Sequence, residues 1–150
     1  MLSKIIRNVL VVIIALVIGS VINIGIVMIG SGIIGVPEGV DPNDMESIKA
    51  NAHLYRPHHF IVPFLAHAIG TLAGAFIVAK FVLSNFKILT LLVGGIFLLG
   101  GIGAAFMLPE FWKFSIIDII FAYFPMAILG WNLAGKPKEE GIKSDFETLD

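Results

Sequence analysis

The sequence predicts an all-α membrane protein, a four-transmembrane-helix antiparallel bundle with a short amphipathic helix in the first outer loop. Hydrophobic residues make up 57 % of the 150 residues and charged residues only 14 %, and the mean hydropathy is +0.96. So little polar surface cannot cover so much apolar surface in water. We therefore expect lipid to be the solvent of this chain.

Four apolar stretches are each long enough to cross a hydrocarbon core of about 30 Å as a helix. A helix satisfies every backbone polar group within lipid, and the stretches lack the alternation of a β-barrel strand. They define a transmembrane domain over residues 1–135, followed by a polar cytoplasmic tail at residues 136–150. The expected spans are residues 9–34, 60–79, 88–107 and 114–134.

The positions of the basic residues predict the orientation. An amino terminus inside the cell places seven of them in the cytoplasm, namely Lys4, Arg7, Lys80, Lys87, Lys136, Lys138 and Lys143. Only Lys49, Arg56 and Lys113 then lie outside. Because cytoplasmic loops carry the excess of Lys and Arg, we expect both termini to be cytoplasmic, with the protein in a bacterial inner membrane.

The loop after the first span is the only long one. Asp41 suits a helix N-cap, and Pro42 suits the first helical position. Met45, Ile48 and Ala52 then share one helical face. This pattern predicts the short amphipathic helix lying on the outer surface.

Small residues are the expected contacts between spans, because lipid leaves close packing as the main force between helices. The second span contains Gly70-x-x-x-Gly74, and the third contains Gly94 and Gly101. Packing within one chain and formation of a homo-oligomer both explain such motifs. Pro125 lies inside the fourth span, where we expect it to kink the helix.

Two ionisable residues lie within predicted spans. His67 is in the second span and Asp118 in the fourth, and a charge there is costly unless it meets a partner or water. We expect the two side chains to face one cavity and share a hydrogen bond, with Asn23 nearby. This set is either a proton-relay or ligand site, or a polar clasp between helices, or an Asp118 wetted at the interface.

A second polar group occupies the outer loop, with metal-binding candidates His58, His59, Glu38 and Asp41. Imidazoles and carboxylates together suit zinc, but no His-Glu-x-x-His motif occurs, and acids in loops also act as caps. The chain has no cysteine, so thiolate chemistry is excluded. We expect no cofactor and no nucleic-acid partner, since the net charge is −1.

Several short motifs carry a resemblance. Pro37-Glu38-Gly39-Val40-Asp41 follows the first span, and Ala66-His67-x-x-Gly70-x-x-x-Gly74 lies in the second. Met107-x-Pro109-x-x-Trp112 precedes the fourth span, and Phe124-Pro125-x-Ala127-x-Leu129-Gly130 lies within it. The order of these motifs resembles a widespread, uncharacterised family of small bacterial four-helix integral membrane proteins. The resemblance implies four spans in a bacterial inner membrane, and it implies no activity or catalytic residue.

Three functions are compatible with the sequence. The first is a non-enzymatic accessory or scaffold component of a membrane assembly, with lipid, further copies or other membrane proteins as partners. The second is a small transporter or proton-coupled carrier that uses the intramembrane His67 and Asp118. The third is a membrane enzyme acting on lipid or quinone at the outer interface. The sequence contains no recognisable catalytic set, which favours the first.

Overall fold

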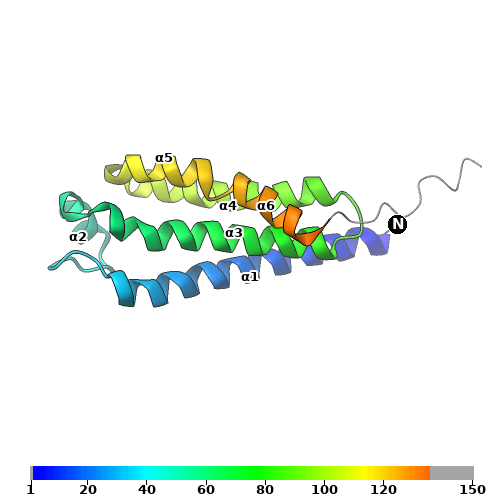
Figure 1. The fold of residues 1–150 in the computed structure, drawn as a ribbon, viewed down its shortest axis with the longest axis horizontal. Coiled ribbons are helices and arrows are strands. Elements are labelled where there is room, and N and C mark those ends of the chain that lie inside the picture. The colour runs from blue at the N-terminus through cyan, green and yellow to red at the C-terminus, as the bar shows by residue number, and fades with distance from the viewer. Residues whose placement is uncertain (1, 136–150) are drawn as a thin grey trace, which may run out of the picture.

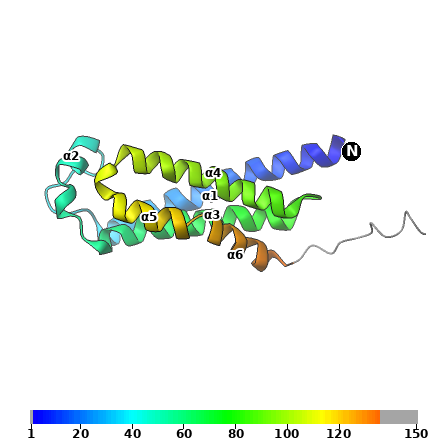
Figure 2. The same ribbon diagram turned by 90° about the horizontal axis from the view of Figure 1, so that it is seen from above.

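The computed structural model describes residues 2–135, and the predicted tail at 136–150 lies outside the described residues. The described part is mostly helical and contains no strand. Its long helices run side by side along one axis (Figures 1 and 2). They are α1 (Leu2–Ile34), α3 (Ile61–Phe81), α4 (Phe86–Met107), α5 (Trp112–Phe121) and α6 (Phe124–Ala134).

Four helical segments are long and apolar enough to cross a membrane. Many large apolar side chains on their outer faces are exposed, which suits a chain whose outer solvent is lipid rather than water. The structure therefore agrees with a multi-pass membrane protein. The four segments are Leu2–Ile34, Pro57–Phe81, Phe86–Met107 and Pro109–Ala134.

α1 begins at Leu2, well before the start expected at residue 9. Hydrogen bonds of the Asn8 side chain hold its first turns in place. The Asn8 Oδ1 atom accepts a hydrogen bond from the Leu83 backbone N–H at 2.9 Å. Its amide nitrogen donates to the Ser84 hydroxyl at 3.0 Å. One nearly buried side chain thus ties α1 to the turn between α3 and α4.

α1 packs along α3 through small residues. A Cβ added at Gly70 would lie 2.8 Å from the Gly19 carbonyl oxygen, and one added at Gly74 would lie 3.1 Å from the Ala15 carbonyl oxygen. Gly70 and Gly74 therefore let the two backbones approach more closely than any side chain would allow. Beyond Gly74, a core of Ala15, Val78, Val82 and Val93 is fully packed.

The loop helix begins later than the sequence suggests. α2 spans Met45–Ala50, and its N-cap is Asp44, whose side chain accepts from the Glu46 backbone N–H at 3.0 Å. Asp41 instead accepts from the Asn43 N–H at 2.9 Å and closes a tight turn. Both residues are good caps, and the one next to the helical segment takes that role.

The fourth span is two helices rather than one kinked helix. α5 ends at Phe121 and α6 begins at Phe124, with Tyr123 outside helical geometry at φ −115° and ψ −81°. Pro125 stands in the first turn of α6, where a missing N–H breaks no hydrogen bond. The predicted kink is therefore a break that precedes the proline.

Candidate functional site

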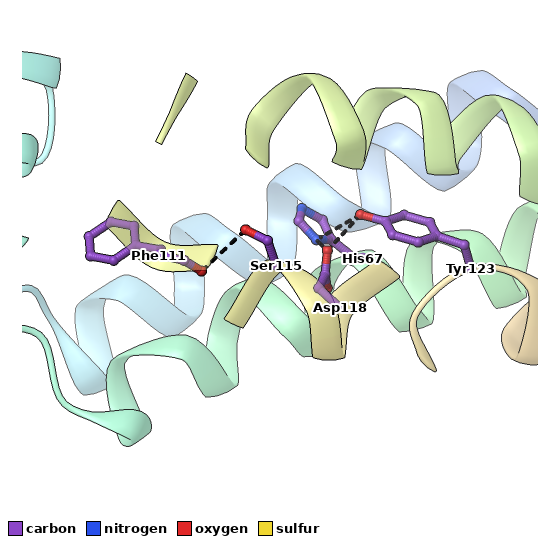
Figure 3. A network of polar contacts seen from close by, with 5 residues as sticks. All are labelled: His67, Phe111, Ser115, Asp118 and Tyr123. Carbon is purple, nitrogen blue, oxygen red and sulfur yellow. Dashed lines mark hydrogen bonds and ion pairs between the residues drawn. The ribbon is translucent and has the colours of Figure 1, made fainter. Parts of the chain in front are cut away.

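The structure brings His67 and Asp118 together in the middle of the helices. His67 comes from α3 and Asp118 from the last turns of α5. The His67 Nδ1 atom lies 2.7 Å from the Asp118 Oδ2 atom (Figure 3). The Asp118 side chain is 5 % exposed and that of His67 is 26 % exposed, so the carboxyl group is enclosed while the imidazole reaches open space.

Tyr123 is the third member of the site, and the sequence analysis did not identify it. Its hydroxyl donates to Asp118 Oδ2 at 2.7 Å and lies 3.1 Å from His67 Nδ1. The Tyr123 and His67 rings stack with centroids 5.8 Å apart. The break between α5 and α6 turns this tyrosine back toward Asp118, which regular helical spacing would not predict. The one signal for it in the sequence is that a tyrosine, with a polar hydroxyl group, lies inside an apolar span.

Two protons hold the three side chains together. Tyr123 has a single hydroxyl proton and donates it in a hydrogen bond to Asp118 Oδ2. The contact between His67 Nδ1 and the same oxygen therefore needs a further proton, held either by the imidazole or by the carboxyl group. This short bond joins two groups that both exchange protons, so the cluster is chemically suited to accept and release one.

Asp118 keeps one oxygen for another partner. Its Oδ1 atom is buried and makes no hydrogen bond within residues 2–135. A carboxylate in hydrocarbon costs roughly 2.5–3.5 kcal/mol on insertion scales, and two donors on the other oxygen offset only part of that. A buried acceptor without a partner is unusual in a folded protein and marks Asp118 as a residue that needs an explanation.

A cavity of about 340 Å³ adjoins His67 and Asp118. Its walls are mostly apolar, and its far end is aromatic, with the Phe60 and Phe114 rings stacked at 4.8 Å between centroids. Tyr55 and Phe111 continue this aromatic end, at 4.9 Å between centroids. We call this space the first cavity. A mostly apolar pocket with a few converging polar groups is the usual form of a small-molecule site.

A second cavity of about 260 Å³ lies on another side of His67. Asn23 lines it, and this places Asn23 near the cluster without joining it. No hydrogen bond links the Asn23 side chain to His67 or Asp118 in the described part of the chain. The predicted trio is therefore a hydrogen-bonded pair with Asn23 across a cavity.

The outer-loop metal candidates do not converge. In the part of the chain that the structure describes, no three His, Cys, Asp or Glu side chains form a group that could hold a metal ion. His59 Nδ1 instead accepts from the Arg56 backbone N–H at 2.8 Å, and the His58 and His59 rings lie 4.0 Å apart. Glu38 and Asp41 are exposed in the preceding loop.

The remaining predicted packing glycines support the site directly. A Cβ added at Gly101 would overlap the Tyr123 hydroxyl, so only glycine leaves room for that group. A Cβ added at Gly94 would lie 2.8 Å from the Ala127 Cβ atom, where α4 contacts α6. These two glycines therefore bring α4 onto the broken fourth span, and Gly101 places the tyrosine.

Comparisons with protein-family models, with curated proteins and with solved structures give no match. The resemblance to a family of small bacterial membrane proteins therefore stays a prediction. Any function must be argued from the site itself.

Proposed function

We propose that this chain is a small proton-coupled carrier of a bacterial inner membrane, with an amphipathic molecule bound in the first cavity. In this proposal the four spans form an antiparallel bundle. The observation that carries it is the enclosed Asp118, held at one oxygen by both His67 and Tyr123 and unpaired at the other beside the cavity.

The chemistry of the site suits a molecule with one polar end. The first cavity offers aromatic and aliphatic walls to an apolar body, and His67 and Asp118 offer a donor and acceptors to its head. Protonation of the pair changes its charge and its donors. Binding of the polar end is therefore linked to binding of a proton.

The broken span supports transport rather than simple binding. Discontinuous membrane helices are the common way to place a polar site in a transporter, because the break frees backbone groups next to the substrate. Here the break falls at Ala122 and Tyr123, directly after Asp118. Movement of α6 relative to α5 would carry Tyr123 away from the carboxyl group and so change the site.

The charges at the two ends support the proposed orientation. Lys4 and Arg7 begin α1, at the end opposite α2 (Figure 1). Lys80 and Lys87 flank the turn to which Asn8 is tied, so they lie at the same end as Lys4 and Arg7. Four basic residues at this end, against Lys49, Arg56 and Lys113 toward the other, support an amino terminus in the cytoplasm. The proposal then places α2 on the outer surface.

The accessory-subunit hypothesis rests on the scarcity of polar groups. Because two polar side chains within the spans, His67 and Tyr123, converge on the Asp118 carboxyl group, the carrier explains more of the structure. The enzyme hypothesis required His58 and His59 to act with His67. His59 does line the first cavity with His67, but its Nδ1 atom is occupied by the Arg56 N–H, and His58 lines neither cavity.

The test is to identify what the protein carries from its own membrane. The chain is extracted with a lipid-solubilising polymer, without detergent, and co-purifying small molecules are measured by mass spectrometry. We expect one amphipathic compound in stoichiometric amount with the unmodified chain and its loss from Asp118→Asn. The labelled compound should then cross proteoliposome membranes in response to a pH gradient.

Glu110→Gln is the matched control, because it makes the same chemical change at an exposed carboxylate that lines neither cavity. Equal retention of the compound by Asp118→Asn and Glu110→Gln would refute the site. Retention without transport would refute the carrier and leave a binding protein.

A further inference from the structure

The second cavity is more polar in its lining than a lipid-filled gap would be. Ser20 and Asn23 of α1, Thr71 of α3 and the site residues His67 and Tyr123 all contribute to its wall. The volume of about 260 Å³ exceeds that of several water molecules, each of which occupies about 30 Å³ in the liquid. Water persists in such a space where two to four polar partners are available.

Thr71 provides an independent observation. Its side chain is 1 % exposed, and its Oγ1 atom has no hydrogen-bond partner within residues 2–135. A buried hydroxyl without a partner loses about 1–3 kcal/mol, so a position like this normally meets water. Thr71 lines the second cavity, so its unpaired hydroxyl adds to the polar groups beside that space.

Phe97 separates this space from the tightly packed part of the molecule. A Cβ added at Gly19 would lie 2.8 Å from the Phe97 ring, and one added at Gly74 would lie 3.2 Å from it. The Phe97 ring of α4 therefore packs against the contact between α1 and α3, beside the second cavity. Phe97 lines the second cavity on one side and packs against the apolar core on the other, so the cavity does not extend into that core. Ser20 and Gly100 in its wall are exposed, so the cavity opens at the surface of the bundle.

We propose that the second cavity holds water and supplies protons to the His67–Asp118–Tyr123 cluster, separately from the first cavity, where the substrate binds. This inference rests on the proposed carrier function. His67 is the residue that makes the separation possible, since it lines both cavities and bonds to Asp118.

The proton transfer is balanced at each atom. A hydronium ion in the second cavity gives its proton to His67 Nε2 and becomes water. The proton on His67 Nδ1 then moves to Asp118 Oδ2. The imidazole returns to a neutral state with its proton on the other nitrogen, and the carboxylate becomes a neutral acid. Release of the proton runs the same steps in reverse.

Cysteine labelling tests whether the cavity is wet, because the chain has no cysteine of its own. Ser20→Cys and Gly100→Cys place thiols in the cavity wall, and a Cβ at Gly100 meets no atom within 4 Å. Their neighbours Val21→Cys and Leu99→Cys are controls, because these side chains are 63 % and 69 % exposed and do not line the cavity. The probe is a charged methanethiosulfonate reagent on the full chain in lipid vesicles.

Only a thiolate reacts, and an apolar environment suppresses thiolate formation by about tenfold for each unit of raised thiol pKa. We expect the two cavity thiols to react at least about tenfold faster than the two controls. Equal rates would show a dry cavity filled by lipid chains and would overturn the inference. A variant with altered folding would be recognised by its size-exclusion profile. The comparison would then rest on the other pair of a cavity thiol and its neighbouring control.

Deuterium exchange tests the proton route. At acid pH the carboxyl infrared band of Asp118 is assigned by its loss in Asp118→Asn, and its shift in heavy water is followed over time. We expect Asn23→Leu, which fills the second cavity, to slow this exchange several-fold. Ser31→Leu, which lies in the first cavity on the same helix, should leave it unchanged. The opposite order would overturn the inference.

These measurements need no substrate, so they separate the two proposals. A dry second cavity combined with Asp118-dependent binding of a compound would refute the water route alone. A wet second cavity combined with no compound lost from Asp118→Asn would refute the carrier alone.

Discussion

The two ends of the helical assembly are packed in contrasting ways. At the closed end, which contains Asn8, Ala15, Val78 and Val93, small side chains bring the helices into contact and every polar group of Asn8 is paired. At the open end, aromatic rings and the His67–Asp118 pair line two cavities between the helices. The closed end is closely packed, whereas the open end contains the two buried polar atoms that lack a partner within residues 2–135, Thr71 Oγ1 and Asp118 Oδ1.

Substitution at the contact between α1 and α3 should have the largest effect on stability. In Gly70→Val, the new Cβ would lie 2.8 Å from the Gly19 carbonyl oxygen, and backbone cannot move aside cheaply. We expect a loss of about 3 kcal/mol in the free energy of unfolding, measured by denaturant titration in lipid nanodiscs. Gly25→Val, with no atom within 4 Å of its Cβ, is the control. Equal losses would show that the close approach is unimportant.

Removal of the Asn8 clamp should come next. Asn8→Leu keeps the volume of the side chain but leaves the Leu83 N–H and the Ser84 hydroxyl without their partner. We expect a loss of about 2 kcal/mol by the same measurement. Asn132→Leu makes the same exchange at an exposed position, and it should change little. If Asn8→Leu lost no more stability than Asn132→Leu, the hydrogen bonds of Asn8 would not distinguish the closed end from the open end.

Tyr123→Phe should have a smaller effect on stability and a large one on function. It removes the hydroxyl that donates to Asp118 Oδ2 and leaves the packing of the ring intact. We expect a loss of about 1 kcal/mol in stability, together with weaker retention of the bound compound. A double-mutant cycle with Asp118→Asn should give a non-additive result. Strict additivity would show that the hydroxyl and the carboxyl group do not interact.

The smallest expected effect is on how stability depends on pH, through the hydroxyl group of Tyr55 at the open end. Burial raises the pKa of the Tyr55 hydroxyl above its ordinary value of about 10. Its contribution to stability is fully present below the ordinary pKa and is lost as the pH rises through the raised one. Thermal unfolding should therefore show an alkaline loss that Tyr55→Phe reduces. Because the chain has two tyrosines, Tyr123→Phe leaves Tyr55 alone for a spectroscopic titration.

Much of the fold follows from hydropathy alone. Four apolar stretches predict four helices, because an unpaired backbone N–H or C=O group in lipid is too costly. Contacts between helices do not remove this need for backbone hydrogen bonds. The pairing of His67 with Asp118 follows from the same logic, since each ionisable side chain within a span needs a partner. With so few such residues, there was little choice of partner.

Other features depend on geometry that spacing does not encode. Asp44 rather than Asp41 caps α2, although both have the same chemistry. The pair His58 and His59 looked like metal ligands, but the His59 ring closes its own turn. The sequence did not predict the role of Tyr123, because the break between α5 and α6 that directs it toward Asp118 is visible only in three dimensions.

The sequence by itself determined that the chain is helical, that it has four apolar segments of membrane-crossing length and that few polar groups lie within them. These properties depend on the free energy of moving residues between water and lipid, which each segment experiences on its own. The tertiary structure alone decided that His67 lies between two cavities and that Asp118 keeps one oxygen unpaired. Such features depend on how closely neighbouring helices approach, and that distance is set by contacts between residues far apart in the chain.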